Sequence, residues 1–487
     1  MKRKLISLLF IFLSVFTLAS CSNKDILLFL NWGEYVDEEL LDAFEDKYNC
    51  IVVMDLSETN EIFYSKVRGG TTIYDVVCPS DYMVEKMYEN DMLEKLDFTK
   101  LDTFVAKYAQ SEGVDLENDE AYNTFVDGIT SQDVINYYKN NELRLGVQNI
   151  YNQMNDALVE KLGDKYNPTT DNISNYFVPY LWGTWGICYT TRNAELVNVV
   201  KNTANPWDLL CNKSILPANT KVAMYDSAMH AYFALCKYLG YDTHSELPKS
   251  DLDNIIKAIK DMGYTSWGTD QIKKNIVSEN LDLGFMWTGD FLYYYAEQAV
   301  ERITTALEEE EIEESEIAQM LDGLINNESQ SYTSIAGKEY KIGFDLVIPD
   351  DTIAFCDNLV MTKDAKHKDL AYKFIDFMNS NGVLIDEEDP ETEVTPQFSN
   401  TYYVDYDAPT NAVYDDLVAL KDTDLDEVLA QIEAGEDIVL EDVIYDIAIG
   451  YAFDKYYPKD TTKGKILANF DRKYINTINK TLNNAKV

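Results

Sequence analysis

Aromatic rings and carboxylates recur together in this chain at the ends of apolar, strand-like segments. The first set is Asn31-Trp32-Gly33-Glu34-Tyr35, and the second is Ser80-Asp81-Tyr82. Later members of the group are Asp226, Trp287, Phe355, Asp357 and Tyr406. Carboxylates bind ammonium groups, and rings offer apolar and π surfaces to methylene stems and ammonium groups. The residue types therefore favour a site for a flexible polyammonium ion.

The same residue types leave other chemistry open. Lysine and arginine are absent from these sets, so we do not expect an anion site. Another small cation or a stacked sugar would also suit such a cleft, and paired carboxylates among rings are typical of a surface glycoside hydrolase. The histidines His230, His244 and His367 are far apart and have no zinc spacing, so we expect neither a metal nor a cofactor.

Alternating patterns indicate the elements that position the first sets. Apolar segments over 26–32 and 50–56 predict strands, and helical spacing from Val36 to Tyr48 predicts a helix between them. A helix around 62–67, a short strand over 74–78 and a helix from Tyr82 follow. This order predicts a parallel sheet with helices on both faces, in which ligands bind at the carboxyl ends of the strands.

The rest of the chain shows weaker patterns. We expect strands over 222–225 and 283–287, an extended segment over 351–361, and helices over 228–238, 370–378, 441–457 and 466–482. The polar segment 107–165 is interpreted as an inserted helical segment on the surface. The charge runs over 308–316 and 386–393 are typical of a solvated helix face and an acidic loop.

The beginning of the sequence predicts export. Lys2, Arg3 and Lys4 precede an apolar run over 5–18 that is too short to span a bilayer, and Leu18-Ala19-Ser20-Cys21 follows. This ending matches the lipobox of bacterial lipoproteins, so we expect cleavage before Cys21 and a lipid on its thiol. The protein would then be anchored at the extracellular face of the cell membrane or in the periplasm. An ordinary secretory signal with a chance cysteine is the alternative.

The amino-acid composition limits the classes of partner that the protein can bind. The 487 residues carry a formal net charge of −44, which repels nucleic acid and anionic lipid headgroups. A hydrophobic content of 46% supports a real core, with room for two or three domains. The cysteines after Cys21 form no C-x-x-C pair, and we interpret them as buried thiols: Cys50, Cys78, Cys188, Cys211, Cys236 and Cys356.

The motifs also resemble those of a known family. Asn31-Trp32-Gly33-Glu34-Tyr35-Val36 resembles the opening motif of bacterial spermidine/putrescine-binding proteins, the solute receptors of polyamine ABC importers. Further matches occur in the family's order and cover most of the chain outside two acidic insertions. They are Ser57-Glu58-Thr59-Asn60-Glu61, Tyr74-Asp75-Val76-Val77-Cys78-Pro79-Ser80, Val178-Pro179-Tyr180-Leu181-Trp182-Gly183-Thr184, Leu239-Gly240-Tyr241, Gly284-Phe285-Met286-Trp287-Thr288-Gly289 and Tyr406-Asp407-Ala408-Pro409-Thr410-Asn411.

The resemblance implies an α/β protein of the type II periplasmic-binding-protein fold, with two lobes and a ligand cleft between them. We expect a signal peptide over 1–20, a first lobe over 21–187 with its insertion at 107–165, a second lobe over 188–352, a return to the first lobe over 353–405, and C-terminal helices over 406–487, mainly in the second lobe. The implied function is that of a non-enzymatic lipoprotein. It captures putrescine or spermidine and delivers it to the transmembrane permease of an ABC importer.

The resemblance also assigns roles within the cleft, with Asp357 as the acid that binds an ammonium group. The expected ligand-binding residues, including the acids of the first two sets, are Trp32, Glu34, Tyr35, Ser80, Asp81, Tyr82, Asp226, His230, Trp287, Phe355, Asp357 and Tyr406. One departure concerns His230, because the family often carries an acid a few residues after Asp226. A histidine there is mostly neutral near pH 7, so a diamine and a triamine both remain open as ligands.

Overall fold

The β-α-β pattern near the beginning of the chain forms the first sheet. The computed structural model describes residues 24–327, 329–382, 384–385 and 393–486. Strand β1 (Asp25–Asn31) pairs in parallel with β2 (Cys50–Leu56) and β3 (Val76–Val77). Helices α1 (Glu38–Tyr48), α2 (Asn60–Gly69) and α3 (Asp81–Glu89) follow these three strands. The carboxyl ends of the strands therefore meet at one edge, as the sequence pattern predicts.

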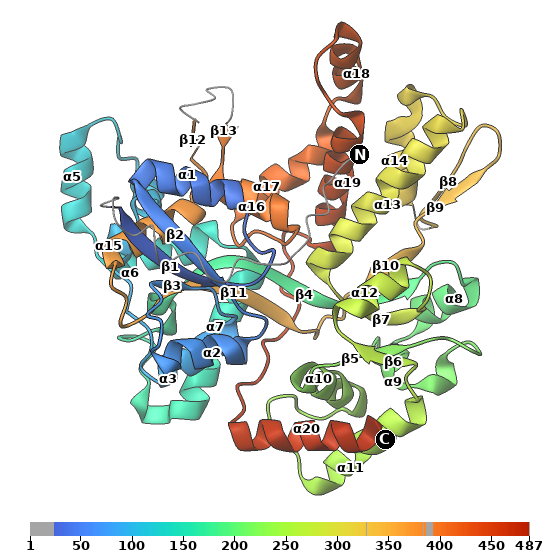
Figure 1. Ribbon diagram of the computed structural model, residues 1–487, viewed down its shortest axis with the longest axis horizontal. Helices are drawn as coiled ribbons and strands as arrows, with labels where there is room; N and C mark the ends of the chain where they lie inside the picture. Colours follow the sequence, from blue (N-terminus) through green and yellow to red (C-terminus); the bar gives the residue numbers. More distant parts are fainter. Residues whose placement is uncertain (1–23, 328, 383, 386–392, 487) are drawn as a thin grey trace, which may run out of the picture.

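A single long strand joins this sheet to the rest of the molecule. The first half of β4 (Val178–Thr190) pairs with β11 (Ala354–Met361), which in turn pairs with β3. The second half of β4 pairs with β7 (Leu283–Trp287) and β10 (Phe344–Val347). All of these later pairings are antiparallel, whereas the parallel sheet predicted for the first three strands is confirmed. The β4–β11 pair is antiparallel because β4 runs from the first lobe into the second and the chain returns to the first lobe along β11 (Figure 1).

The second lobe surrounds β7 and β10. A small parallel pair, β5 (Ala223–Tyr225) and β6 (Ser266–Gly268), lies beside them. The other elements of this part of the chain are α8 (Ala194–Asn202), α9 (Asp208–Cys211), α10 (Ala228–Leu239), α11 (Lys249–Met262), α12 (Asp270–Val277), α13 (Thr288–Glu308), α14 (Ile317–Ile325), β8 (Ser331–Thr333) and β9 (Glu339–Lys341). The charge run over 308–316 is mostly exposed, so it is solvated as predicted, but only its first residue belongs to helix α13 and the predicted helix face is wrong for the rest.

The elements after β11 are divided between the two lobes. The remaining elements are α15 (Lys368–Met378), β12 (Leu384–Ile385), β13 (Glu393–Val394), α16 (Pro396–Val404), α17 (Asn411–Ala419), α18 (Leu425–Ala434), α19 (Leu440–Tyr456) and α20 (Arg472–Lys486). Helix α19 packs against α13, and α20 packs against α10 and α11 (Figure 1). The prediction of a helix from residue 466 is wrong for its first six residues. These residues have no regular secondary structure and follow Lys465, which forms an isolated bridge with Ile353. Of the predicted acidic loop, residues 386–392 lie outside the described residues.

The segment 107–165 is helical, as expected, but only part of it lies on the surface. It contains the end of α4 (Asp102–Ser111), then α5 (Asp119–Gly128), α6 (Ser131–Tyr137) and α7 (Leu145–Leu162). Helix α5 has no buried residue and lies at the outer edge of the molecule (Figure 1). Helix α7, in contrast, buries an apolar stripe that includes Ile150 and Met154 and packs against α3 and β11. The interpretation as a surface insertion is therefore wrong for α7, which belongs to the core of the first lobe.

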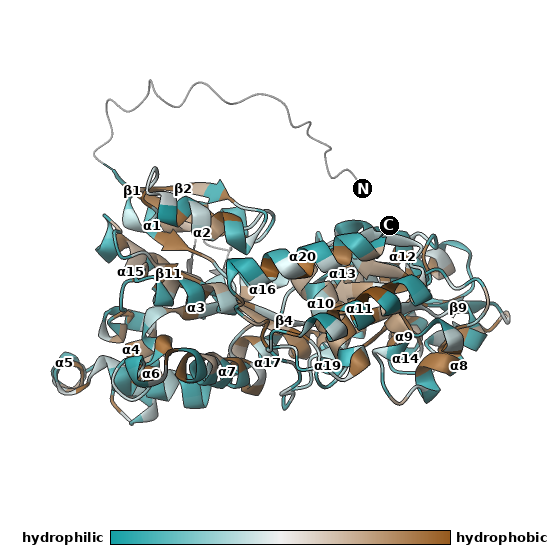
Figure 2. Cartoon of the chain, turned by 90° about the horizontal axis from the view of Figure 1, so that it is seen from below, coloured by the Kyte–Doolittle hydropathy of each residue, from teal (hydrophilic) through white to brown (hydrophobic). Residues whose placement is uncertain are grey.

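The core lies along the central strands. Figure 2 shows hydrophobic residues concentrated in strands such as β4, with polar residues on the outer faces of the helices. The six described cysteines are buried free thiols, which confirms the sequence interpretation. No helix in the described part of the chain combines the length and apolar character needed to cross a membrane.

Candidate ligand-binding cleft

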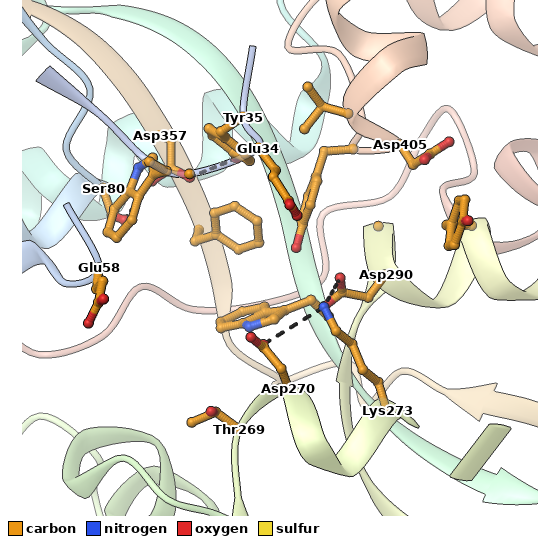
Figure 3. Close-up of a pocket in the computed structure, with 18 of the residues that line it drawn as sticks. Glu34, Tyr35, Glu58, Ser80, Thr269, Asp270, Lys273, Asp290, Asp357 and Asp405 are labelled. Carbon is orange, nitrogen blue, oxygen red and sulfur yellow. Dashed lines mark hydrogen bonds and ion pairs between the residues drawn. The ribbon is translucent and has the colours of Figure 1, made fainter. Parts of the chain in front are cut away.

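A cleft with a volume of about 1950 Å³ separates the two lobes. All twelve of the ligand-binding residues expected from the sequence line it. They come from the loop after β1, the beginning of α3, the loop after β5, the first turn of α10, the end of β7, β11 and the segment after α16. Figure 3 shows several of them around the cavity. The structure thus gathers residues from across the whole chain around one space.

Asp357 is a buried carboxylate on the β11 side of this cleft. Its side chain accepts a hydrogen bond of 2.5 Å from the Ser80 hydroxyl and one of 2.8 Å from the Tyr35 hydroxyl. The residue is 5% exposed, and none of the ion pairs among the described residues includes it. Burial raises the pKa of Asp357 to about 6, although both hydrogen bonds act to lower it. The carboxylate is therefore mostly ionised at pH 7 and lacks a positive partner within the described protein.

Local structure fixes the Ser80 hydroxyl for this contact. Ser80 is the N-cap residue of α3, but its side chain makes no capping hydrogen bond to that helix. Instead, Asn60 donates to the Ser80 hydroxyl and accepts from the Ser80 backbone amide, both at 3.0 Å. Hydroxyls of N-cap residues usually satisfy free amides of the helix, so this one serves the cleft at some cost to α3.

Asp81 is a second buried acid and holds α3 against β11. Its carboxylate accepts hydrogen bonds from the backbone amide of Cys356 at 2.8 Å and from that of Tyr82 at 2.6 Å. Burial raises the pKa of Asp81 to about 7, and the nearby charge of Asp357 adds to the increase. Asp81 thus positions the strand that carries Asp357.

Four rings form a continuous series across the cleft. Tyr35 contacts Tyr406 with ring centroids 5.6 Å apart, Tyr406 contacts Phe355 at 5.8 Å, and Phe355 contacts Trp287 at 5.0 Å. The series begins in the first lobe and ends in the second, so it offers a continuous apolar surface to a ligand stem. A side chain at Gly183 would lie 2.9 Å from the Phe355 ring, which explains the glycine in this part of β4.

Two predicted residues of the second lobe have partners within the protein. Nδ1 of His230 lies 2.8 Å from the Ser227 hydroxyl, and its ring packs against Trp287 with centroids 5.4 Å apart. Burial lowers the pKa of His230 to about 4, so this side chain is neutral at pH 7. Asp226 forms an ion pair with Lys486 of α20.

The structure adds a group of charged residues that the sequence patterns did not indicate. Lys273 of α12 extends into the cleft, with its ammonium nitrogen 2.6 Å from Asp290 and 3.8 Å from Asp270 (Figure 3). Asp290 directly follows the Trp287-Thr288-Gly289 motif, so its position could have been read from the sequence. No sequence signal distinguishes Lys273 from its neighbour Lys274, because both belong to a polar helix.

The cleft is strongly acidic. The described residues that line it include twelve carboxylates, one lysine and no arginine. Such a wall raises the local concentration of cations and repels anions. No group of His, Cys, Asp and Glu side chains in the described part of the chain could hold a metal ion. The acidic lining of the cleft therefore favours cations in general.

Comparisons with known proteins find relatives that are named as polyamine-binding proteins. The family model of a hypothetical lipoprotein, the MG045 family, matches residues 1–193. The chain is 23% identical over 276 residues to the spermidine/putrescine-binding periplasmic protein of Salmonella typhimurium. That match covers 56% of this chain and 61% of the relative, which is less than two thirds of its length. The chain is also 23% identical over 376 residues to the putrescine-binding periplasmic protein PotF of Escherichia coli, with 75% of each chain covered.

Solved structures show the same fold. The spermidine/putrescine ABC transporter substrate-binding protein PotD of Streptococcus pneumoniae has a TM-score of 0.52 at 19% identity, with 95% of this chain and 99% of that chain covered. The Tp0655 lipoprotein of Treponema pallidum has a TM-score of 0.53 at 16% identity, with 95% and 99% covered. The chain therefore has the predicted two-lobed fold of periplasmic binding proteins, and its resemblance to spermidine/putrescine-binding proteins is confirmed. The Salmonella, Escherichia and Streptococcus proteins are named as binding proteins, not as enzymes.

Proposed function

We propose that this protein is a non-enzymatic receptor that captures a polyamine, putrescine or spermidine, and delivers it to the permease of an ABC importer. The observation that carries the proposal is the Asp357 carboxylate, which is buried, faces the cleft and has no positive partner in the described protein. A buried charge without a partner is costly, and a ligand ammonium group removes that cost. The names of the relatives support a polyamine as the source of this group.

The surroundings of Asp357 suit the rest of such a ligand. Ser80 and Tyr35 each occupy a lone pair of the carboxylate and hold it in place. An ammonium group on the remaining lone pairs would form a charge-assisted hydrogen bond, which is stronger than a neutral one. The methylene stem would then lie along Phe355 and Trp287, whose rings are adjacent. One ammonium group and the methylene stem of a polyamine thus have matching surfaces.

Lobe closure would complete binding and signal the loaded state to the permease. β4 and β11 connect the lobes, so we place the hinge there and divide the lobes near residues 187 and 352. The ligand favours the closed state because only that state contacts it from both lobes. The other cleft residues expected from the sequence, including Trp32, Glu34 and Tyr82, would contact the ligand in the closed state.

We further propose that a lipid on Cys21 anchors the protein outside the cell. Cys21 lies outside the described residues, and the proposal rests on the sequence before it. The match of residues 1–193 to a family described as hypothetical lipoproteins supports it. A lipid anchor would keep the receptor close to its permease.

A thermal-shift panel tests the ligand class. A ligand that binds only the folded state raises the melting temperature by mass action. Putrescine and spermidine should raise it, whereas amino acids, phosphate, sulfate and neutral sugars should leave it unchanged. A shift with a sugar and none with polyamines would overturn the proposal. Release of products from glycans would show a hydrolase instead.

A further inference from the structure

Three acids that face the cleft from the second lobe are already paired with lysines of the protein itself. Lys273 lies 2.6 Å from Asp290 and 3.8 Å from Asp270, and Lys486 pairs with Asp226. Asp357 on the first-lobe side has no such partner in the described protein. These three acids of the second lobe therefore already have positive partners, whereas Asp357 in the first-lobe wall can still bind an ammonium group of a ligand.

The Lys273 side chain has the same chemistry as one end of a polyamine. It consists of a primary ammonium group on a stem of four methylene carbons, which is the aminobutyl unit of putrescine. The side chains of Lys273 and Asp290 are each 20% exposed, so their pair is largely shielded from solvent. Burial alone would lower the pKa of Lys273, but the carboxylates of Asp290 and Asp270 outweigh it and the net shift is upward. Lys273 is therefore charged at pH 7 and occupies a place where a ligand amine could bind.

We propose that Lys273 is a specificity-determining residue, which fills the amine position at Asp290 with its own ammonium group and so favours putrescine over spermidine. This inference rests on the proposed polyamine function. With Lys273 in place, the third amine of spermidine would meet an Asp290 carboxylate that is already paired. The Lys273 ammonium group would also repel that amine. A diamine needs fewer carboxylates and loses less from this arrangement.

The test compares both amines across a small set of variants by calorimetric titration. Lys273→Met removes the charge and keeps much of the stem, and Lys273→Gln is a second neutral variant in case the first fails to fold. Lys273→Arg keeps the charge. The matched control is Lys274→Met on the same helix, because Lys274 is exposed and does not line the cleft. Circular dichroism checks that each variant is folded.

We expect the neutral variants to raise the affinity for spermidine relative to putrescine by about tenfold, the effect of roughly one ionic contact. Lys273→Arg and Lys274→Met should keep the wild-type ratio within about twofold. The double variant Lys273→Met with Asp290→Asn should lose the gain, since it removes the carboxylate that Lys273→Met exposes. An unchanged ratio in the folded neutral variants would overturn the inference and leave the polyamine function intact. Failure of the wild type to bind either amine would instead overturn the proposed function itself.

Discussion

The Tyr35 hydroxyl donates a hydrogen bond of 2.8 Å to the Asp357 carboxylate, although the two residues are 322 positions apart in the chain. Tyr35 lies in the loop after β1, and Asp357 lies on β11, the strand that returns from the second lobe. The bond therefore fixes the returning strand against the first lobe. It also orients a charged oxygen at the point where the proposed ligand amine binds.

The affinity for polyamines should depend on pH through Asp357. The pKa of its carboxyl is raised to about 6 in the ligand-free protein, and the ligand binds the ionised form. Affinity should therefore be nearly constant above pH 7 and should fall below pH 6 by up to about tenfold per unit. Calorimetric titration between pH 5 and 8 measures this profile.

Two variants test which titratable group causes the pH dependence of the affinity. His230 has a pKa lowered to about 4, so His230→Asn should keep the shape of the wild-type profile. Asp357→Asn should flatten it. A wild-type affinity that stays constant from pH 8 to pH 5 would rule out Asp357 as the anchoring acid.

Asp357→Asn should stabilise the ligand-free protein at neutral pH. The folded-state pKa of Asp357, about 6, lies above the ordinary value of 3.8, so the folded state binds this proton more tightly than the unfolded state. The free energy of unfolding of the wild type therefore falls by on the order of 3 kcal/mol as the pH rises from about 4 to 6. The gain in melting temperature from Asp357→Asn should be small at pH 4, grow to pH 6 and then level off. An equal gain at all pH values would point to a change in packing instead.

A buried ion pair between Arg144 and Asp407 should stabilise the connection between the lobes. Both side chains are 0% exposed and lie 2.5 Å apart, and Arg144 also donates to the backbone carbonyl of Tyr457 at 2.9 Å. Arg144→Met leaves the Asp407 carboxylate buried without its partner, which typically costs about 3–5 kcal/mol. The exposed Arg68 offers a control, and Arg68→Met should cost less than about 1 kcal/mol. Denaturant unfolding of both variants measures the difference, and similar losses would contradict the assigned role of the pair.

Cys21→Ala should release the protein from the membrane. The variant lacks the thiol that would carry the lipid, so metabolic labelling with a radioactive fatty acid should disappear. Cell fractionation should find the protein outside the membrane fraction. Wild-type labelling and fractionation in the variant would end the lipoprotein proposal.

Much of the first lobe could be predicted from the sequence because its pattern is local. Strand β2 has the predicted bounds, and the alternation of apolar and helical segments placed the sets around Trp32 and Ser80 at one sheet edge. The ring-and-carboxylate pattern also selected Trp287, Phe355 and Asp357, but their place in one cleft with Tyr35 came only from the family resemblance, since nothing local brings Asp357 close to Tyr35. That proximity depends on the antiparallel pairing of β11, a long-range property.

Other features depended on packing that a single sequence does not reveal. The segment 107–165 looks polar as a whole, and its amphipathic part did not reveal that the stripe of α7 around Ile150 is buried against β11. Lys273 and Lys274 look alike, and only the position of α12 beside Asp290 distinguishes them. Asp226 lines the cleft as expected, but its ion pair with Lys486 of the distant helix α20 had no signal in the sequence.

The most direct test of the central claim is calorimetric titration of putrescine and spermidine into wild-type protein, Asp357→Asn and Asp127→Asn. Asp127 is an exposed acid on α5, outside the cleft, and its replacement changes the net charge equally. Loss of one partner of a buried charged pair costs about 2–5 kcal/mol, so Asp357→Asn should weaken binding by about 30-fold or more. Asp127→Asn should stay within about twofold of wild type. Equal, small losses in both variants would show that the general negative charge, not the Asp357 carboxylate, holds the ligand.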